Sequence, residues 1–213
     1  AGIGATCTAE GTFELDASIM EGKDLSAGAV AGLKHVKHPI NAAYAVKTKS
    51  PHVMLSGAGA EEFAKEQGLE MVEDNMYFAT PKTMEWIEKL KQESKKNGTV
   101  GCVVLDKQGN LTAGTSTGGM FKKRWGRIGD SPVIGAGTYA DNNSCAVSCT
   151  GHGEYFIRHA VAFDVCARYK YLKESVEKAA DYIIHTELNT NAGNGGLIAV
   201  DKLGNIAMPY NSG

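Results

Sequence analysis

Thr99 stands where a threonine can become a nucleophile. A threonine hydroxyl needs a neighbouring base, and an N-terminal threonine carries one in its own α-amine, whose pKa is about 7.7–8.0 in model compounds. Thr99 follows Gly98 and the polar segment 88–97 (EKLKQESKKN), and it opens the apolar run 99–105 (TVGCVVL). Cleavage between Gly98 and Thr99 would therefore expose an N-terminal threonine at the tip of a strand. The alternative is a hairpin turn at Asn97-Gly98, or a linker that meets a strand.

A second group of hydroxyls lies at 114–119 (GTSTGG). Its glycines resemble a phosphate-binding loop, but no Gly-Lys-Ser or Gly-Lys-Thr follows, so the P-loop pattern is absent. Thr117 lies on the return strand of a predicted hairpin, and the two ends of a hairpin lie side by side. We therefore expect its hydroxyl to approach that of Thr99. The alternative is a strand that ends in a glycine turn with surface hydroxyls.

The segment 122–132 (KKRWGRIGDSP) places basic residues around an aromatic residue and glycines. Such a patch can grip nucleic acid, but Lys and Arg number 22 against 24 Asp and Glu, and the net charge is −2. This balance argues against a nucleic-acid partner. Arg127 and Asp130 could instead bind a free amino acid, the guanidinium holding the carboxylate and the aspartate the ammonium. A surface ion pair is the alternative.

The segment 150–154 (TGHGE) lies where a predicted strand meets a predicted helix. Backbone N–H groups at a helix N-terminus form an anion site, which would suit the oxyanion of an acyl transfer. His152 and His159 are available as bases, but an N-terminal threonine needs no other base. We assign neither histidine a catalytic role.

The first half of the chain predicts two strands followed by helices. The strands cover 13–20 and 27–33, joined by a polar turn, and a helix begins at Pro39. Further helices are predicted over 60–68 and from Thr80-Pro81, before the polar linker 88–97. The composition of 99–105 predicts a buried strand.

The second half contains an internal repeat. Segments 101–119 and 196–213 each read strand, Asp-Lys-x-Gly-Asn, strand, which predicts two β-hairpins. A strand at 146–150 and helices over 154–172 and 175–188 lie between them. Because the strands are grouped on either side of paired helices, we expect stacked sheets covered by helices rather than alternating parallel βαβ units.

The composition is that of a folded protein. The chain has 213 residues, 43% hydrophobic and 22% charged, which indicates one domain or at most two small ones. No uncharged apolar run reaches the roughly 18 residues of a membrane-spanning helix, so we expect a soluble protein without a membrane partner. The chain starts at Ala1 without methionine and ends directly after a strand-like segment, so we expect the middle of a longer protein. The compartment, cytoplasmic or periplasmic, stays open.

Five cysteines are present, an odd number without CxxC pairs. Cys145 and Cys149 have an even spacing in a strand-like run, which puts both on one face. We expect buried free thiols rather than metal ligands or disulfides.

Taken together, the motifs resemble the plant-type asparaginase and isoaspartyl peptidase family of N-terminal-nucleophile hydrolases. The resemblance covers nearly the whole chain and depends on motifs in one order. These are AGIGA (1–5), ELDASIMEGKDLSAGAVAG (14–32), SPHVML (50–55), NGTVG (97–101), TSTGG (115–119), GRIGDSP (126–132), GAGTYAD (135–141) and TGHGE (150–154).

The resemblance implies a role for each matching residue. Thr99 is the nucleophile, freed by autocatalytic cleavage after Gly98, and Thr117 is the second active-site threonine. Arg127 and Asp130 match the family's grip on the α-carboxylate and α-amine of the substrate.

The resemblance extends to the oxyanion hole and to the fold. Thr150 and Gly151 match the oxyanion hole, and Gly153 a backbone contact to substrate. The implied fold is α+β, an αββα sandwich of two mainly antiparallel sheets, incomplete at both ends. The implied activity is hydrolysis of isoaspartyl dipeptides and of the L-asparagine side-chain amide. No cofactor is expected, although a structural sodium ion is consistent with the family.

Cleavage would divide the chain into an α portion, 1–98, and a β portion, 99–213. The resemblance implies that the two stay associated in one structural domain, as a dimer of αβ units. The family's opening strand, its His-Gly-Gly segment, much of its sodium-binding loop and its C-terminal tail lie outside this sequence.

Two alternatives remain. The first is a glycosylasparaginase, because members of that family share segments like GDSP with this chain. They resemble one another, however, in having Asp directly before the nucleophile, where this chain has Gly98. The second alternative is an inactive fragment that keeps the fold and is never cleaved.

Overall fold

The computed structural model describes residues 2–88, 98–191 and 193–212. The chain divides into two compact units. Unit 1 comprises Ala1–Ala17, Gly28–Val100 and Ser116–Ile128, and unit 2 comprises Ser18–Ala27, Gly101–Thr115 and Gly129–Gly213. Each unit takes residues from both sides of the Gly98–Thr99 bond. The predicted α and β portions therefore do not correspond to the compact units, and the cut itself stays a prediction.

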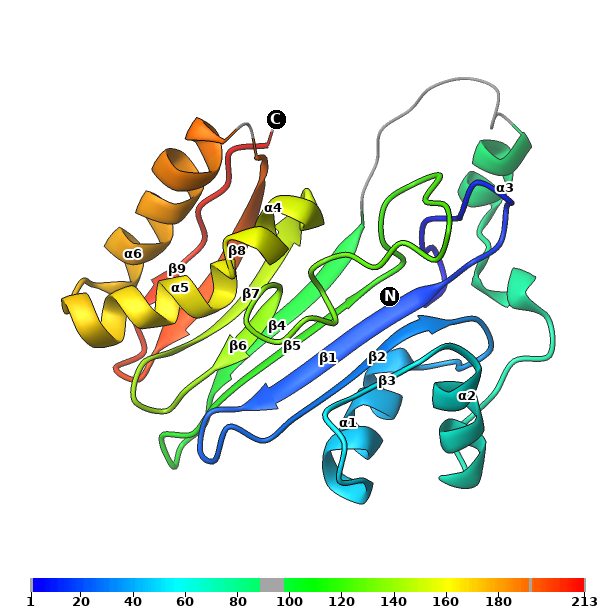
Figure 1. Ribbon diagram of the computed structural model, residues 1–213, viewed down its shortest axis with the longest axis horizontal. Helices are drawn as coiled ribbons and strands as arrows, with labels where there is room; N and C mark the ends of the chain where they lie inside the picture. Colours follow the sequence, from blue (N-terminus) through cyan, green and yellow to red (C-terminus); the bar gives the residue numbers. More distant parts are fainter. Residues whose placement is uncertain (1, 89–97, 192, 213) are drawn as a thin grey trace. The chain divides into compact units, whose positions relative to one another are not determined.

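The first sheet has five strands in the order β3-β2-β1-β5-β4 (Figure 1). Its strands are β1 (Leu15–Glu21), β2 (Ala27–Leu33), β3 (Met54–Ser56), β4 (Thr99–Leu105) and β5 (Leu111–Thr117). The two predicted strands of the first half are confirmed as β1 and β2. The sequence did not predict β3, which has three residues and pairs in parallel with β2.

The second sheet has four antiparallel strands in the order β6-β7-β8-β9. They are β6 (Thr138–Ala140), β7 (Cys145–Gly151), β8 (Gly195–Asp201) and β9 (Ile206–Ala207). Pairing of β7 with β8 runs from Cys145 opposite Asp201 to Gly151 opposite Gly195.

The two predicted hairpins are confirmed, and their turns share one hydrogen-bond pattern. The backbone N–H of Asp106 donates to the carbonyl of Asn110 at 2.9 Å, and Asp201 donates to Asn205 at 3.0 Å. Each aspartate carboxylate accepts the backbone N–H of the asparagine four residues later. The repeated Asp-Lys-x-Gly-Asn therefore makes the same turn twice.

Within unit 2 the two sheets pack face to face. Met20 of β1 and Leu111 and Ala113 of β5 form one apolar cluster with Ala146 of β7 and Val200 of β8. The predicted α+β class with stacked sheets and covering helices is confirmed.

In unit 1 the helices are α1 (Pro39–Lys49), α2 (Gly57–Glu66) and α3 (Pro81–Glu88), with a 3₁₀ turn η1 at Asn75–Phe78. Pro39 occupies the first turn of α1, as predicted. Gly28 of β2 lies so close to the backbone of Ala43 and Lys47 in α1 that a Cβ would overlap it. Glycine thus allows α1 to pack directly on β2.

In unit 2 the helices are α4 (Gly153–Arg158), α5 (Val161–Ala167) and α6 (Val176–Tyr182). The last two continue as π-helical turns, η2 (Arg168–Leu172) and η3 (Ile183–Leu188). Figure 1 shows α5 and α6 against the second sheet, and their apolar residues form its core with Val147 and Leu197.

The predicted single helix 154–172 is wrong, because the chain breaks between α4 and α5. Ala160 adopts a left-handed conformation with φ of 47°. The N–H groups of Ala162 and Phe163 donate to the carbonyls of Ala136 and Gly135 at 3.1 and 2.8 Å. Carbonyl groups from another segment therefore accept the backbone N–H groups in the first turn of α5. No Gly or Pro in the sequence marks the break.

The prediction that 99–105 is a buried strand is wrong in its burial. β4 forms, but it is the edge strand of its sheet, and Val100 and Val104 are 64% and 45% exposed. Apolar composition does not separate an edge strand from a central one. Cys102 of β4 is likewise exposed, whereas the other four cysteines are buried.

Candidate active site

The hydroxyls of Thr99 and Thr117 meet at one end of neighbouring strands in unit 1. Thr99 begins β4 and Thr117 ends β5, and the Asp106 turn joins the two strands at their other end. Thr99 Oγ1 donates to Thr117 Oγ1 at 3.2 Å. The predicted approach of the two hydroxyls is therefore confirmed, and their catalytic roles stay predictions.

Thr117 also contacts the bond expected to be cut. Its Oγ1 donates to the carbonyl oxygen of Gly98 at 3.0 Å and accepts the N–H of Gly119 at 2.9 Å. The hydroxyls of 115–117 are nearly buried, and Thr117 is 3% exposed. The alternative of a glycine turn with surface hydroxyls is therefore wrong.

The turn that follows Thr117 is held by buried groups of unit 1. Thr6 Oγ1 donates to the carbonyl of Gly119 at 2.8 Å. Gly118 lies against the backbone of Thr6, and a Cβ on Gly119, whose φ is +79°, would come within 3.2 Å of Lys123 Nζ. Both glycines therefore permit a close approach that fixes the N–H donor to Thr117.

Lys123 belongs to a buried group of charges that the sequence did not predict. Its side chain is 1% exposed, its Nζ donates to the carbonyl of Glu14 at 2.9 Å, and it lies 3.9 Å from Asp16 Oδ2. Asp16 is fully buried, and its Oδ1 accepts the N–H of Gly32 at 2.8 Å. An acidic residue inside the apolar strand 13–20 was the available signal, because a buried charge requires a partner.

Burial dominates the electrostatics of this group. Burial raises the pKa of Asp16, while the positive charges of Lys123 and Arg127 oppose the rise. Burial also lowers the pKa of Lys123, against the attraction of Asp16 and Glu14. Arg127, half-buried at the end of the same loop, therefore lies within electrostatic reach of the group.

The remaining predicted residues lie in unit 2. Asp130 is 5% exposed, so it does not fit the alternative of a surface ion pair. Thr150 and Gly151 end β7, where Thr150 is exposed. A Cβ on Gly151 would overlap the backbone of Asn194 and the ring of Phe156, so only glycine fits there.

Gly153 is buried and begins α4, which is flanked by His152 before it and His159 after it. The N–H of His152 donates to the carbonyl of Asn194 at 2.9 Å, and its ring stacks on Tyr155. His159 Nδ1 lies 3.2 Å from Glu187 Oε1. Both histidines therefore have contacts within the fold.

Comparison with known proteins identifies the relatives of this chain. A family model described as "Asparaginase" matches residues 1–213. The chain belongs to this family. The curated isoaspartyl peptidases of Salmonella typhimurium and Escherichia coli are 49% and 46% identical to it. A human protein named isoaspartyl peptidase/L-asparaginase is 41% identical. All three alignments cover 100% of this chain, and 72%, 70% and 71% of the respective relatives.

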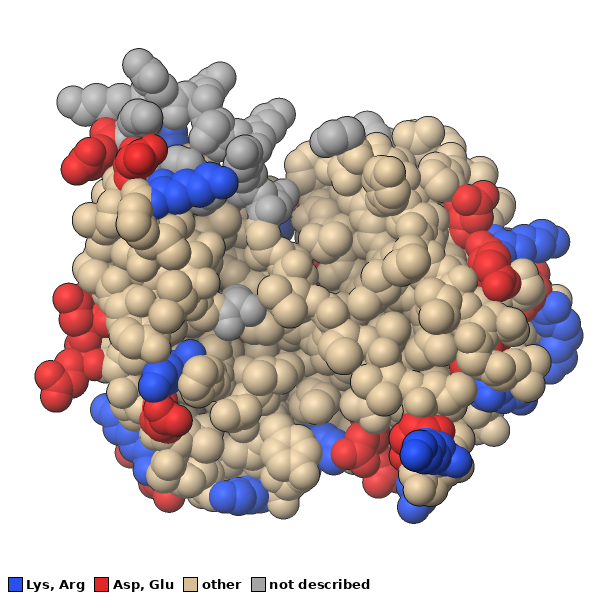
Figure 2. Space-filling model, turned by 180° about the vertical axis from the view of Figure 1, so that it is seen from behind, with Lys and Arg blue, Asp and Glu red and all other residues tan. Residues whose placement is uncertain are grey.

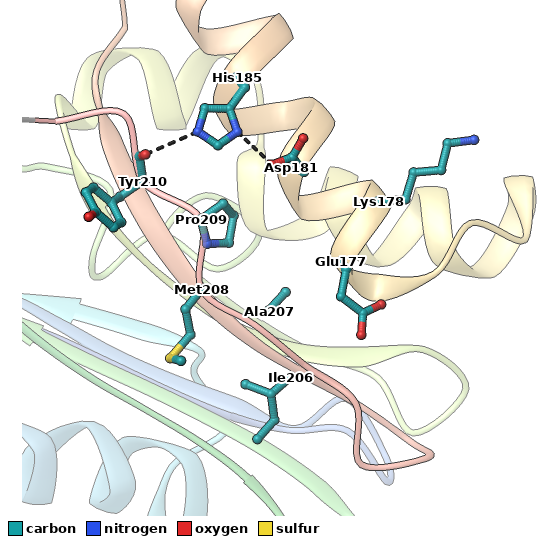
Figure 3. Close-up of a pocket in the computed structure, with 9 residues that line it drawn as sticks. All are labelled: Glu177, Lys178, Asp181, His185, Ile206, Ala207, Met208, Pro209 and Tyr210. Atoms are coloured by element: carbon teal, nitrogen blue, oxygen red, sulfur yellow. Dashed lines mark hydrogen bonds and ion pairs between the residues drawn. The ribbon is translucent and has the colours of Figure 1, made fainter.

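A separate pocket of unit 2 contains none of the predicted site residues. It has a volume of about 580 Å³ and lies between α6 and segment 206–210 (Figure 3). His185 Nδ1 lies 2.7 Å from Asp181 Oδ1, and its Nε2 lies 3.2 Å from the carbonyl of Tyr210. No Ser, Thr or Cys lines this pocket among the described residues, so the Asp-His pair there has no nucleophile to activate.

Surface charge is mixed in this asparaginase-family chain. On the face in Figure 2, basic and acidic side chains are interspersed around a largely uncharged centre, without a continuous basic patch. Of the helices in the described ranges, none combines the length and apolar character needed to cross a bilayer.

The resemblance implies a structural sodium ion, a hard cation that oxygen ligands such as backbone carbonyls would hold. In the described part of the chain, no cluster of three or more His, Cys, Asp or Glu side chains could hold a metal ion. At the start of the chain, the carbonyls of Gly2 and Thr8 already accept the backbone N–H groups of Ala5 and Gly11. We therefore assign no step to the ion, which stays a prediction.

Proposed function

We propose that the chain is a self-cleaving hydrolase of β-aspartyl (isoaspartyl) dipeptides and of the L-asparagine side-chain amide. The observation that carries this proposal is the row of hydrogen bonds from Thr99 Oγ1 through Thr117 Oγ1 to the Gly98 carbonyl. It joins a nucleophile, a hydroxyl donor and the carbonyl of the bond to be cut. Membership of the asparaginase family and the names of the relatives support the substrate class.

Self-cleavage begins when Thr99 Oγ1 attacks the carbonyl carbon of Gly98. The oxygen of that carbonyl gains negative charge, and the Thr117 hydroxyl already donates to it, which stabilises the developing oxyanion. The proton that Thr99 Oγ1 loses is taken up by the Thr99 nitrogen, which then leaves this carbon as an amine, and an ester between Gly98 and Thr99 Oγ1 remains. Water then hydrolyses the ester, frees the Gly98 carboxylate and leaves Thr99 with a free α-amine.

The free α-amine of Thr99 is then the base for its own hydroxyl. Thr99 Oγ1 attacks the β-aspartyl carbonyl of the substrate, and the amine passes the proton to the departing nitrogen. Ammonia leaves from asparagine, and a whole amino acid leaves from an isoaspartyl dipeptide. Water, activated by the same amine, releases aspartate and restores the enzyme. Thr117 stays beside the nucleophile and orients its hydroxyl.

Substrate recognition is assigned to charged and backbone groups. Arg127 holds the α-carboxylate and Asp130 the α-ammonium of the aspartyl group, because each offers the complementary charge. Thr150 and the backbone of Gly151 receive the oxyanion, and Gly153 contributes a backbone contact. These four assignments rest on the motif resemblance and on the burial of Asp130 and the tight fit of Gly151.

The two products of cleavage are proposed to stay together. In the first sheet, β1 and β2 come from residues before Gly98, and β5 and β4 from residues after it. Because β1 is hydrogen-bonded to β5, separation of the products would break the sheet. A dimer of these αβ units remains the expected assembly.

The test combines Thr99→Ala with Thr99→Ser. The wild-type full chain should give two pieces, of 98 and 115 residues and roughly 10 and 12 kDa, and should hydrolyse β-aspartyl-Leu. Thr99→Ala should give one intact band and no hydrolysis, whereas Thr99→Ser keeps a hydroxyl and should still be cut. Cleavage of Thr99→Ala at the same bond would assign the processing to another protease, and an uncut wild-type chain would favour the inactive fragment.

A further inference from the structure

Two buried cysteines of unit 2 lie in contact. The sulfur of Cys145 is 2.9 Å from the sulfur of Cys166, across 21 residues of sequence. Cys145 begins β7, and Cys166 lies in the last turn of α5. A disulfide bond is about 2.05 Å long, so closing it requires a movement of roughly 0.9 Å.

The backbone on both sides of this contact is held in place. Ser144 Oγ donates to the carbonyl of Cys166 at 2.7 Å, and the Cys166 thiol donates to the carbonyl of Cys145 at 3.3 Å. All seven residues of β7 pair with β8, beginning with Cys145 opposite Asp201. The two sulfurs therefore face each other on rigid elements, and the fold itself selects this pair.

We propose that Cys145 and Cys166 form an intrachain disulfide when the chain folds under oxidising conditions. With glutathione disulfide as oxidant, one cysteine thiolate attacks it and releases one glutathione. The second cysteine then attacks the mixed disulfide, forms the Cys145–Cys166 bond and releases another. Two protein thiols are oxidised, one glutathione disulfide is reduced, and both protons leave on glutathione.

The geometry favours this pair over the neighbouring cysteine of the same strand. Cys149 lies on the same face of β7 as Cys145, but four residues of strand separate them by roughly 13 Å. A disulfide within the strand is therefore excluded while β7 is formed.

The bond should form during folding rather than afterwards. Cys145 and Cys166 are 0% and 2% exposed, so a dissolved oxidant does not reach them in the folded protein. Burial, together with the hydrogen bond to Cys145, also raises the pKa of Cys166 well above its usual value, which keeps it a thiol. Once closed, the same burial protects the bond from reductants.

To test this, the full chain is synthesised in two cell-free reactions. One, the glutathione sample, contains a mixture of reduced and oxidised glutathione, and the other contains reductant alone. Each product is denatured, alkylated with iodoacetamide and weighed without digestion, as the two pieces that self-cleavage would give. In the glutathione sample, three of the five thiols should be alkylated, and a peptide map should join Cys145 to Cys166. With reductant, all five should be alkylated. Five alkylated thiols in the glutathione sample, or a bond between any other pair, would overturn the proposal.

Matched variants and a melting measurement complete the test. Cys145→Ala and Cys166→Ala should each remove the cross-link, while Cys102→Ala, at the exposed cysteine, should keep it. The oxidised wild type should melt about 6–12 °C above the reduced form, because the bond closes a loop of 21 residues. An equal Tm in both states would contradict a stabilising bond, and the mass measurement on the wild type does not depend on the variants folding.

Discussion

Thr117 Oγ1 lies between the Thr99 hydroxyl, at 3.2 Å, and the carbonyl oxygen of Gly98, at 3.0 Å. A hydroxyl has one proton to give, and here Thr117 gives it to the Gly98 carbonyl while it accepts from Thr99 and from the Gly119 N–H. The proton of Thr117 is thus directed at the bond that Thr99 would attack. In the proposed mechanism, this one side chain would serve the uncut chain as a donor to the oxyanion, and the cut enzyme as a partner of the nucleophile.

Replacing Thr117 should separate cleavage from folding. Thr117→Val keeps the shape but removes the donor, so we expect self-cleavage to slow by about 10²–10³-fold, as for loss of one oxyanion donor. Thr117→Ser retains a hydroxyl and should restore most of the rate. A time course of the intact band after synthesis measures this, with thermal melting as the control for folding. Cleavage of Thr117→Val at the wild-type rate would remove Thr117 from the mechanism.

The hairpin that forms this site can be predicted from the sequence, but the burial of its strands cannot. The Asp-Lys-x-Gly-Asn turn predicts the hairpin, and the hairpin brings Thr99 and Thr117 together. Composition placed β4 inside the protein, whereas sheet order makes it an edge. Neighbours in a sheet are set by pairings distant in sequence, which a local pattern does not contain.

Long-range contacts also explain the other residues that the sequence did not identify. Lys123 stands in a run of basic residues typical of a surface, yet it is buried beside Asp16, more than a hundred residues away. The break at Ala160 depends on the carbonyls of Gly135 and Ala136. Each of these depends on a partner that only the folded chain brings close.

Removing Asp130 should impair hydrolysis without unfolding the protein. If this buried carboxylate holds the substrate ammonium, Asp130→Ala loses a charge-assisted hydrogen bond of ~1.5–3 kcal/mol. We expect kcat/KM for β-aspartyl-Leu to fall roughly ten- to over a hundredfold, while cleavage at Thr99 is retained. Asp181→Ala, which removes an exposed carboxylate of the same unit, is the matched control. Unchanged kinetics in Asp130→Ala would return this residue to a purely structural role.

The buried Lys123 and Asp16 should be energetically coupled. Lys123→Met leaves the Asp16 carboxylate without its cation, and Asp16→Asn leaves the ammonium without this anion, so each should cost about 3–5 kcal/mol of stability. The double variant should cost less than the sum of the two.

Denaturant unfolding in the uncut Thr99→Ala background measures this cycle, because a single chain then unfolds. Lys37→Met, which removes the cation paired with the exposed Glu70, is the matched control and should have little effect. Strictly additive losses for Lys123 and Asp16 would show that the two charges do not interact.

The substrate preference follows from the surroundings of the nucleophile. Thr99 is half-buried at the tip of the edge strand β4, so this residue is not enclosed by the protein. In the proposed mechanism, the acylated Thr99 holds a β-aspartyl group, and the leaving group lies on the outer side of its carbonyl. An open outer side accepts ammonia or a whole amino acid. We therefore expect both L-asparagine and β-aspartyl-Leu to be hydrolysed, and the dipeptide to be the better substrate.

An asparagine that carries a sugar on its side-chain nitrogen should be hydrolysed poorly at this site. Gly98 occupies the position at which glycosylasparaginases resemble one another by having Asp. The segment TGHGE (150–154) resembles the corresponding segment of the isoaspartyl peptidases. The measurement is kcat/KM for β-aspartyl-Leu, L-asparagine and N-acetylglucosaminyl-asparagine on the same preparation of cleaved full-length enzyme. The uncut Thr99→Ala protein gives the background rate. All three substrates present the same α-carboxylate and α-ammonium and differ only in the leaving group. A clear preference for the glycosylated substrate would therefore replace the isoaspartyl assignment with a glycosylasparaginase.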